Sequence, residues 1–407
     1  MRIESPLLAA LLAAGAALPA WGMGSLPGGA AALGEAAAVV ARPAELDAFP
    51  VNPAAIVGVT ESEILFGGAA QRQHGSYEAP GSAPAIAARA RTYPLPAISA
   101  VFPLTPEWTV GVGLARPYLR HVSWPEGLAD SLAVTAAEVS SAVLTAGFGW
   151  MASPRLSVGF GIDFVQGNVL VQSGYWPLPE NPAQRGRARF QADGVGTGLS
   201  LGLLYRYGER TVAGAVVKVA GQLGGEGRGE FEVPAPYQSL YPEGAVRATL
   251  EAPLSLRAGV SVAPVPTWLV EVDAEWVGSR RLREVGFEFV EQETTWTWDV
   301  GWRDAVNLRL GTRVQANRWL TLRGGYILDW SLEAGSRPSA LLPGRAEHTA
   351  TAGVGIGNGR TRADLALAAT TRSGSHTTTT GFPAGTLRSG ALTISCGLSY
   401  RFPMLVR

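Results

Sequence analysis

Three arginines are the side chains of this sequence best suited to hold an acidic ligand, because a guanidinium group binds a carboxylate through two parallel hydrogen bonds. Arg309 and Arg313 lie four residues apart, and Arg323 follows in the next segment. We take these three as candidate ligand-binding residues. Acids and bases are mixed around them, so they also fit structural networks in a partly dry interior, where unpaired charges are strongly unfavourable.

Residue types that support catalysis or metal binding are few and scattered. The single cysteine, Cys396, excludes an intramolecular disulfide and a cysteine-rich metal site. The run from Gly353 to Gly359 superficially resembles a dinucleotide loop, but no helix or acidic partner follows it. No serine-nucleophile elbow is present. The histidines lack metal-ligand spacing: His74, His121, His348 and His376. The sequence therefore predicts no enzyme, no cofactor and no metal site.

Charge is balanced along the chain. The 407 residues include 33 Lys and Arg against 33 Asp and Glu, and charged residues make up only 16%. A nucleic-acid-binding surface needs a basic excess, so this balance argues against a nucleic-acid partner. The length permits two or three ordinary domains, or one large β-architecture.

The N-terminus has the features of an export signal. Arg2 precedes an apolar run from Leu7 to Leu18, and small residues follow around Ala20. This order is typical of a secretory signal peptide, which we place at residues 1–21. The run is shorter than the ~20 apolar residues that a membrane-spanning helix needs, and no later segment is long enough. If the protein lies in a membrane, it must cross as strands.

Apolar and small or polar residues alternate over long stretches. The pattern is clear at residues 155–165, 246–262 and 306–315. A period of two indicates strands, and these exceed the ~5–6 residues usual in soluble sheets. Because a soluble sandwich also alternates, the pattern alone does not place the chain in a lipid bilayer.

The strand count and the connections favour a membrane barrel. About fourteen strands follow residue 61, and their connections alternate between tight turns and long loops, which is the pattern of outer-membrane barrels. The expected strands lie near residues 61–76, 84–104, 106–121, 133–151, 154–174, 187–207, 210–230, 245–263, 266–288, 296–315, 318–332, 345–358, 360–374 and 387–402.

Aromatic residues gather near the strand ends, as in the girdles at the two membrane interfaces. Trp108, Trp150, Trp268 and Trp319 each lie beside a different tight turn. Charged side chains share faces with Gly, Ser and Thr, and a basic residue at mid-depth on the lipid face would cost about 2–4 kcal/mol. These charges therefore face the lumen. We predict an all-β fold, a 14-stranded antiparallel transmembrane β-barrel over residues 59–407.

Residues 22–58 lie between the signal and the first strand and resemble neither helix nor sheet. A mobile tail is one interpretation. However, fourteen strands enclose more space than their own side chains fill, and an unblocked lumen would leak small solutes. Small residues from Gly28 to Val40 suit packing against a wall, and Pro53 fixes the exit of the segment. We therefore predict an N-terminal hatch, or plug, inside the barrel.

Several short motifs resemble one known family. The segment from Ala32 to Ala36 through Asn52-Pro53-Ala54 is similar to the N-terminal hatch of the long-chain fatty-acid transporter family of Gram-negative outer membranes, the FadL-like OmpP1/FadL/TodX proteins, which include aromatic-hydrocarbon channels. The likeness continues in order along the chain, at residues 193–205, 254–259, 273–276, 302–311, 319–326 and 342–345.

This resemblance implies a mechanism. Members of the family capture hydrophobic ligands at extracellular loops, pass them to an interior pocket, and release them sideways at a kink in strand three after the hatch rearranges. By the resemblance, Asn52, Pro53 and Ala54 take the gating role near that opening. Candidates for the kink are the residues of strand three that favour bends: Gly111, Gly113 and Pro117.

Apolar residues in the expected extracellular loops are candidates for ligand capture, although they also fit loops that pack on one another: Tyr175, Trp176, Tyr237 and Tyr241. The resemblance implies transport of long-chain fatty acids or other hydrophobic small molecules by a monomer in contact with outer-membrane lipid. The alternatives are a general diffusion porin, with an open charged constriction, and a related barrel that serves as a surface or secretion accessory.

Overall fold

The computed structural model describes residues 29–81, 84–125, 135–178, 181–251, 253–278, 284–299, 304–331, 346–376 and 384–402. The predicted signal peptide at residues 1–21 lies outside this part of the chain. Among the described residues, no helix is long and apolar enough to cross a membrane.

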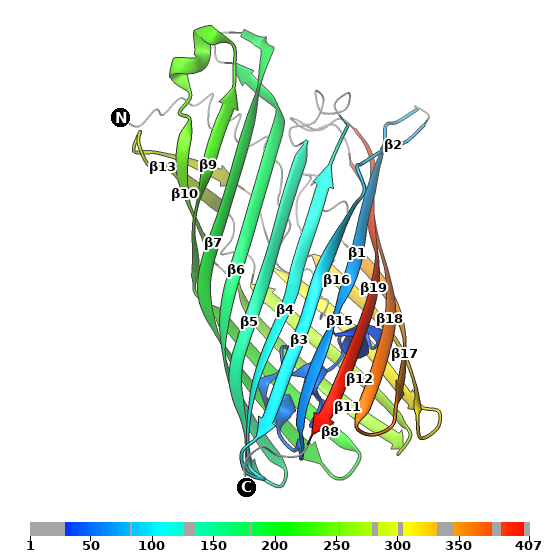
Figure 1. The fold of residues 1–407 in the computed structure, drawn as a ribbon. Helices are drawn as coiled ribbons and strands as arrows, with labels where there is room; N and C mark the ends of the chain where they lie inside the picture. Colours follow the sequence, from blue (N-terminus) through cyan, green and yellow to red (C-terminus); the bar gives the residue numbers. More distant parts are fainter. Residues whose placement is uncertain are drawn as a thin grey trace.

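Antiparallel strands form one closed sheet (Figure 1). The barrel closes where β1 pairs with β19 along its whole length, from Ser62 opposite Phe402 to Glu78 opposite Thr386. The segments are β1 (Ser62–Glu78), β2 (Ile86–Ala87), β3 (Arg91–Pro103), β4 (Trp108–Ser123), β5 (Ala136–Ser153), β6 (Leu156–Leu178), β7 (Asn181–Tyr207), β8 (Thr211–Ala220), β9 (Gln222–Glu232), β10 (Gly244–Glu251), β11 (Leu254–Val265), β12 (Trp268–Gly278), β13 (Glu284–Phe289), β14 (Thr294–Asp299), β15 (Ala305–Gln315), β16 (Leu320–Ser331), β17 (Ala346–Gly357), β18 (Thr361–His376) and β19 (Gly385–Phe402).

Five pairs of consecutive segments each continue one strand. For example, β8 and β9 both pair with β7, while β12 and β13 pair with the adjoining β11 and β10. The other continuous pairs are β2 with β3, β10 with β11, and β14 with β15. The described part of the chain therefore forms fourteen strands, and the predicted 14-stranded antiparallel barrel is confirmed.

The two faces of the wall differ as the alternation predicts. In β7, the side chains of Leu199, Leu201 and Leu203 are 49%, 54% and 47% exposed, whereas Ser200 is 1% exposed. The exposed apolar face suits contact with lipid, and the buried face lines the lumen. Trp108 and Trp150 lie on the outer face beside tight turns, with ring centroids 5.6 Å apart.

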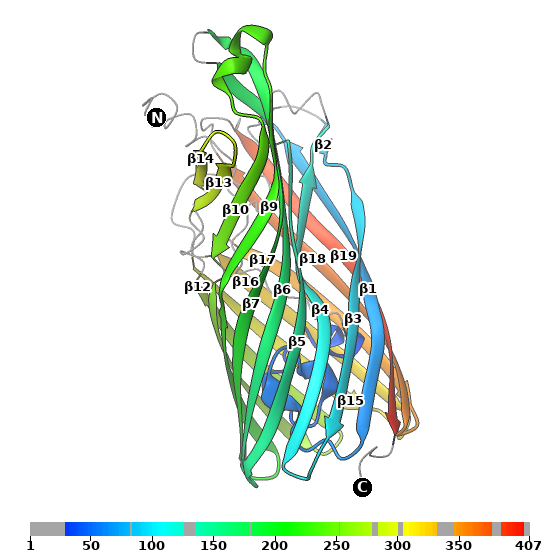
Figure 2. The ribbon, with the colours of Figure 1, turned by 60° about the vertical axis from the view of Figure 1, so that its left-hand side comes forward.

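Residues 29–58 form an internal segment with three short helices: α2 (Ala30–Gly34), η1 (Leu46–Ala48) and η2 (Pro53–Ile56). In both views (Figure 1 and Figure 2) the internal segment lies within the ring of strands, near the end of the barrel where the tight turns are found. Nearly all of its side chains are buried. This position agrees with a plug, and its role as a hatch stays a prediction.

The opposite end of the barrel extends beyond the ring. Strands β6, β7 and β9 rise above the other strands there, and the short helix η3 (Ala235–Leu240) caps them (Figure 1). Since the tight turns of such barrels are periplasmic, this end is extracellular.

Candidate functional site

The internal segment lies directly against the wall because the wall carries glycine where the two meet. A side chain at Gly159 would overlap the backbone of Ala54, and a side chain at Gly202 would overlap Asn52. A Cβ atom at Gly214 would lie 2.5 Å from the Val40 carbonyl oxygen. Because these inward-facing glycines have no side chain, the internal segment can lie directly on the strands. Their alternation within strands is a signal that sequence reasoning missed, because it also fits a plain barrel wall.

Asn52 ties two parts of the internal segment to the wall. Its Nδ2 donates to the Val40 carbonyl oxygen at 2.7 Å and to the Leu203 carbonyl oxygen at 3.4 Å. Its Oδ1 accepts from the Ala54 N–H at 2.9 Å, which caps η2, and Pro53 occupies the first turn. Asn52 and Ala54 are fully buried. The structure therefore brings Asn52, Pro53 and Ala54 together at the contact between the internal segment and β7.

Buried carboxylates of β12 hold the middle of the internal segment. Asp273 accepts from the N–H groups of Val39 and Val40 at 3.1 and 3.4 Å, and Glu271 accepts from the Ala41 N–H at 2.7 Å. These are charge-assisted bonds to backbone groups, which are stronger than neutral ones. The carboxylates of the barrel wall thus accept the backbone N–H groups of residues 39–41, which belong to no helix or strand.

The three predicted ligand-binding arginines contact the internal segment. Arg313 donates to Glu45 at 2.6 Å, and Arg323 donates from Nε to Glu35 at 3.0 Å. Arg309 donates to the Ala36 carbonyl oxygen at 3.4 Å. In this conformation all three arginines bind the internal segment rather than facing free space. Their role in ligand binding stays a prediction.

Two alanines of the internal segment adopt a backbone conformation that L-residues rarely choose. Ala36 and Ala37 both have φ of 56°. The left-handed conformation costs about 1–2 kcal/mol for a residue other than glycine. The barrel supports it, because Arg309 binds the Ala36 carbonyl and Arg257 binds the Ala37 carbonyl. The backbone conformation of the internal segment inside the barrel is therefore stabilised by the wall around it.

Two acids of the internal segment have opposite protonation behaviour. Burial raises the pKa of Asp47 to about 7, although Arg362 lies 3.4 Å away and opposes the change. Burial also disfavours ionisation of Glu45, but Arg313 and Arg362 outweigh it and hold the pKa of Glu45 well below its usual range. The pKa of Asp47 therefore lies near neutral pH.

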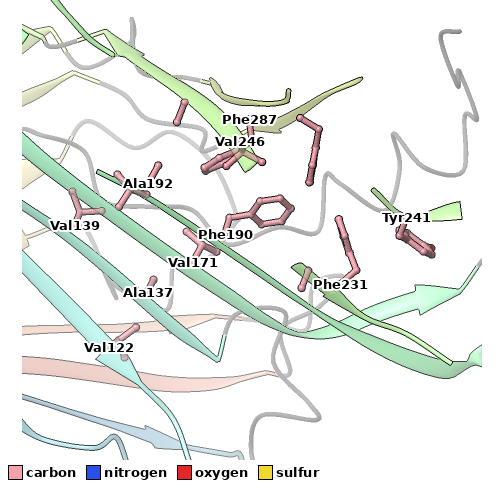
Figure 3. Packing of buried hydrophobic residues seen from close by; sticks show 14 of the residues in the cluster. Val122, Ala137, Val139, Val171, Phe190, Ala192, Phe231, Tyr241, Val246 and Phe287 are labelled. Atoms are coloured by element: carbon pink, nitrogen blue, oxygen red, sulfur yellow. The ribbon is translucent and has the colours of Figure 1, made fainter. Parts of the chain in front are cut away.

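An apolar cluster occupies the lumen above the internal segment. Phe190 lies near the centre of the labelled residues, with the Phe231 and Phe287 rings at 5.5 and 5.0 Å between centroids (Figure 3). The cluster contains Tyr77, Val122, Trp124, Ala137, Val139, Val165, Val169, Val171, Ala188, Phe190, Ala192, Leu223, Phe231, Val233, Tyr237, Tyr241, Val246, Ala248, Phe287, Phe289 and Leu387. Two predicted loop residues, Tyr237 and Tyr241, are therefore brought together inside it.

A recess adjoins the apolar cluster. Its empty volume, including the part open to solvent, is about 310 Å³, and it is lined mainly by small and apolar residues, among them Val169, Ala192, Leu223 and Ala248. The other two predicted loop residues, Tyr175 and Trp176, belong to β6, and their side chains lie outside the described part.

The wall beside this lumen has a gap. The ladder between β3 and β4 ends where Ala97 pairs with Ala115, although β3 continues to pair with β1 from residue 96 to residue 91. The register between β4 and β5 also shifts between Ala115 and Tyr118. Beyond the gap, the Arg89 N–H donates to the Ser123 carbonyl oxygen at 2.7 Å. The third strand of the barrel, which is β4, is therefore irregular at the position where it separates from β3.

The three residues proposed for the strand-three kink lie differently with respect to this gap. Pro117 lies within the register shift between Ala115 and Tyr118. Gly111 and Gly113 lie in the regular part of the ladder between β3 and β4. A Cβ atom at either glycine would lie 3.1–3.3 Å from the ring of Phe49, so both instead provide room for the internal segment. Proline fits the gap because it has no N–H to donate to a neighbouring strand.

Among the described residues, no group of three or more His, Cys, Asp and Glu side chains could hold a metal ion. Cys396 is exposed on the outer face. The site therefore consists of three parts: the internal segment, the apolar cluster and the gap between β3 and β4.

Comparison with known proteins gives a consistent picture. The family model described as outer membrane protein transport protein (OMPP1/FadL/TodX) matches residues 9–401. A FadL homologue from Pseudomonas aeruginosa aligns with a TM-score of 0.77 at 14% identity, covering 96% of this chain and 100% of that chain. No curated protein matches the chain.

Two further solved structures are described as toluene transporters. TodX of Pseudomonas putida has a TM-score of 0.71 at 18% identity, with 93% of this chain and 99% of that chain covered. TbuX of Ralstonia pickettii has a TM-score of 0.68 at 16% identity, with the same coverage of 93% and 99%. At these identities the structures show that the fold is shared.

Proposed function

We propose, on the premise that this chain belongs to the outer membrane protein transport protein family (OMPP1/FadL/TodX), that it carries hydrophobic small molecules, fatty acids or hydrocarbons, across the bacterial outer membrane. Membership of this family makes the protein an outer-membrane transport channel and not an enzyme. The hydrophobic cargo and the route through the barrel are the proposal.

The observation that carries the proposal is the position of the apolar cluster. It lies in the extracellular half of a lumen whose periplasmic half holds the internal segment, and it includes inward-facing rings such as Phe190, Phe231 and Phe287. A channel for polar solutes gains nothing from burying such rings beside the permeation path. An apolar ligand gains by leaving water for this surface, at about 25 cal/mol per Å² of apolar area.

The proposed route has three steps. Ligand enters at the extracellular end, where Tyr237 and Tyr241 join the cluster, and displaces packed rings of the cluster. The internal segment then shifts about Asn52, Pro53 and Ala54, acting as a hatch over residues 22–58. The ligand leaves sideways into the lipid through the gap between β3 and β4, near Pro117. We propose that residues 1–21 are removed on export and that the barrel acts as a monomer.

An uncharged aromatic ligand is the first choice of probe. Eight of the 21 residues of the cluster are aromatic, and aromatic pairs are favoured beyond the area they bury. The solved relatives described as toluene transporters agree with this choice.

The porin alternative conflicts with the arrangement of charges. The lumen arginines Arg309, Arg313 and Arg323 bind the internal segment and do not ring an open constriction. The internal segment also lies in close contact with glycines of the wall, such as Gly159 and Gly202, as a plug requires. The accessory alternative lacks any observation that favours it over transport.

Uptake and conductance measured on the same preparation test the proposal. Purified protein in liposomes should speed the uptake of labelled toluene or oleate over protein-free liposomes, while planar bilayers show no large steady ion current. A large steady current, or uptake no faster than in protein-free liposomes for both probes, would contradict hydrophobic transport. Glucose, which is small and polar, serves as the matched probe that should not enter faster.

A further inference from the structure

The edge of β4 carries backbone groups that need partners above the gap. Beyond Ala115, β4 has no ladder to β3 in the described part of the barrel. The Leu119 carbonyl and the His121 N–H lie on this edge. In the hydrocarbon region each unsatisfied backbone group costs several kcal/mol, so an open sheet edge must be satisfied within the protein.

One side chain satisfies both groups. Gln73 of β1 donates from Nε2 to the Leu119 carbonyl oxygen at 2.9 Å, and its Oε1 accepts from the His121 N–H at 2.8 Å. The second hydrogen on Nε2 goes to Gln71 Oε1 at 2.7 Å. The amide of Gln73 therefore replaces the peptide group that a neighbouring strand would supply. Gln73 is only 6% exposed.

The contacts around Gln73 show that β4 reaches inward at this point. Tyr93 and Leu95 of β3 pack against Leu119 of β4, and all three are buried. The Tyr93 hydroxyl donates to Glu138 at 2.9 Å. On the lumen side, Arg120 of β4 forms an ion pair with Glu347 of β17, which lies across the barrel. The end of β4 is thus held between an apolar contact, a cross-lumen ion pair and the Gln73 amide.

We propose that Gln73 is the latch of a lateral gate, and that its amide bonds to the β4 edge hold the gap between β3 and β4 closed. The inference rests on the proposed sideways release. For ligand to pass, Leu119 must move away from Tyr93 and Leu95, and this movement separates the Gln73 amide from the β4 backbone. Gln73 is a positioning residue and does not itself bind the ligand.

The Gln73 amide is the contact that satisfies the backbone edge of β4 in the closed gap, beside the apolar contact and the ion pair. When the gap opens, water from the lumen reaches both the edge groups and the Gln73 side chain, so both are hydrated. In Gln73→Ala the closed gap leaves the Leu119 carbonyl and the His121 N–H without their partner, whereas the open gap is unchanged. The balance therefore shifts toward the open gap.

The test uses a thiol placed in the gap. In a background of Leu119→Cys with Cys396→Ser, the rate of labelling by a membrane-permeant maleimide reports opening without any transported substrate. Gln73→Ala should raise the labelling rate at least fivefold. Gln73→Glu keeps the acceptor for His121 and loses the donor to Leu119, so it should give an intermediate rate. Gln315→Ala, which removes a glutamine at a periplasmic turn, should leave the rate unchanged.

Labelling and uptake together separate the latch from the proposed function. Faster labelling with faster toluene uptake supports both. Faster labelling with unchanged uptake supports the latch and overturns the sideways route. An unchanged labelling rate in Gln73→Ala overturns the latch, whatever the uptake. If Gln73→Ala does not assemble, the labelling rate of Gln73→Glu decides, and equality with the parent overturns the latch.

Discussion

Replacing Asn52 should unseat the internal segment without unfolding the barrel. Asn52→Ala removes the hydrogen bond to the Ala54 N–H, which caps η2, and the bonds to the Val40 and Leu203 carbonyls. The barrel ladders do not involve this side chain. The internal segment bound against the barrel wall should therefore lose stability relative to a form displaced from the wall.

The magnitude follows from these contacts. Loss of a helix cap costs about 0.5–2 kcal/mol, and leaving a buried carbonyl without its partner costs about 1–3 kcal/mol. Because the effects share one residue, we expect a combined loss of about 2–4 kcal/mol. Each 1.4 kcal/mol changes an equilibrium tenfold, so the displaced form should rise about 30-fold to several hundred-fold.

Single-channel recording measures this change. Displacement opens the periplasmic half of the lumen, so bursts of large conductance should be more frequent in Asn52→Ala by that factor. The matched control is Asn317→Ala, because Asn317 Oδ1 also accepts from backbone N–H groups, at an exposed turn. The reasoning is refuted if Asn52→Ala and the parent show equal burst frequencies while both barrels are correctly assembled.

Three more predictions concern the internal segment and the apolar cluster. Gly159→Val should place side-chain atoms where Ala54 lies and raise burst frequency more than tenfold, and Gly224→Val, where an added Cβ atom would meet nothing within 4 Å, is its control. Asp47 has its ordinary pKa of 3.8 when the internal segment is displaced from the wall, and a pKa of about 7 when the segment lies in its place. Binding of the segment to the wall therefore takes up a proton. The stabilisation of the bound segment by Asp47 is complete below about pH 4 and is lost as the pH rises through 7. Bursts should therefore be rarer at pH 5 than at pH 8, and Asp47→Asn should abolish this difference. Phe231→Ala removes a ring from the cluster and should slow toluene uptake about tenfold with conductance unchanged; equal uptake in the parent and the variant would exclude the cluster from the route.

The barrel was predictable because strand periodicity and turn spacing are local properties. Runs such as residues 199–204 alternate between lipid and lumen, and this alternation is written directly in the sequence. Interruptions within single strands were harder to predict. The break at Gly221 between β8 and β9 leaves the strand direction unchanged, so the sequence pattern continues through it.

The site was only partly predictable because its contacts join distant segments. Arg313 and Glu45 are 268 residues apart, and nothing near Arg313 in the sequence shows that its partner lies in the internal segment. The same holds for Gln73, whose polar side chain on a lumen face resembles many others. Asn52, Pro53 and Ala54 were identified by family resemblance; the structure shows how Asn52 is bonded to Val40 and Ala54, and the gating role of the three residues stays a prediction.

A reversible lock across the wall tests the central claim most directly. Leu95 and Leu119 pack together from the two sides of the gap, so Leu95→Cys with Leu119→Cys, in a Cys396→Ser background, can be joined by a short bis(methanethiosulfonate) crosslinker. It forms one reducible disulfide with each thiol and releases methanesulfinate. The account predicts that toluene uptake falls to the protein-free rate when the lock is formed and recovers on reduction or in unlinked single-cysteine controls. Uptake that is as fast with the lock formed as without it would contradict sideways release between β3 and β4.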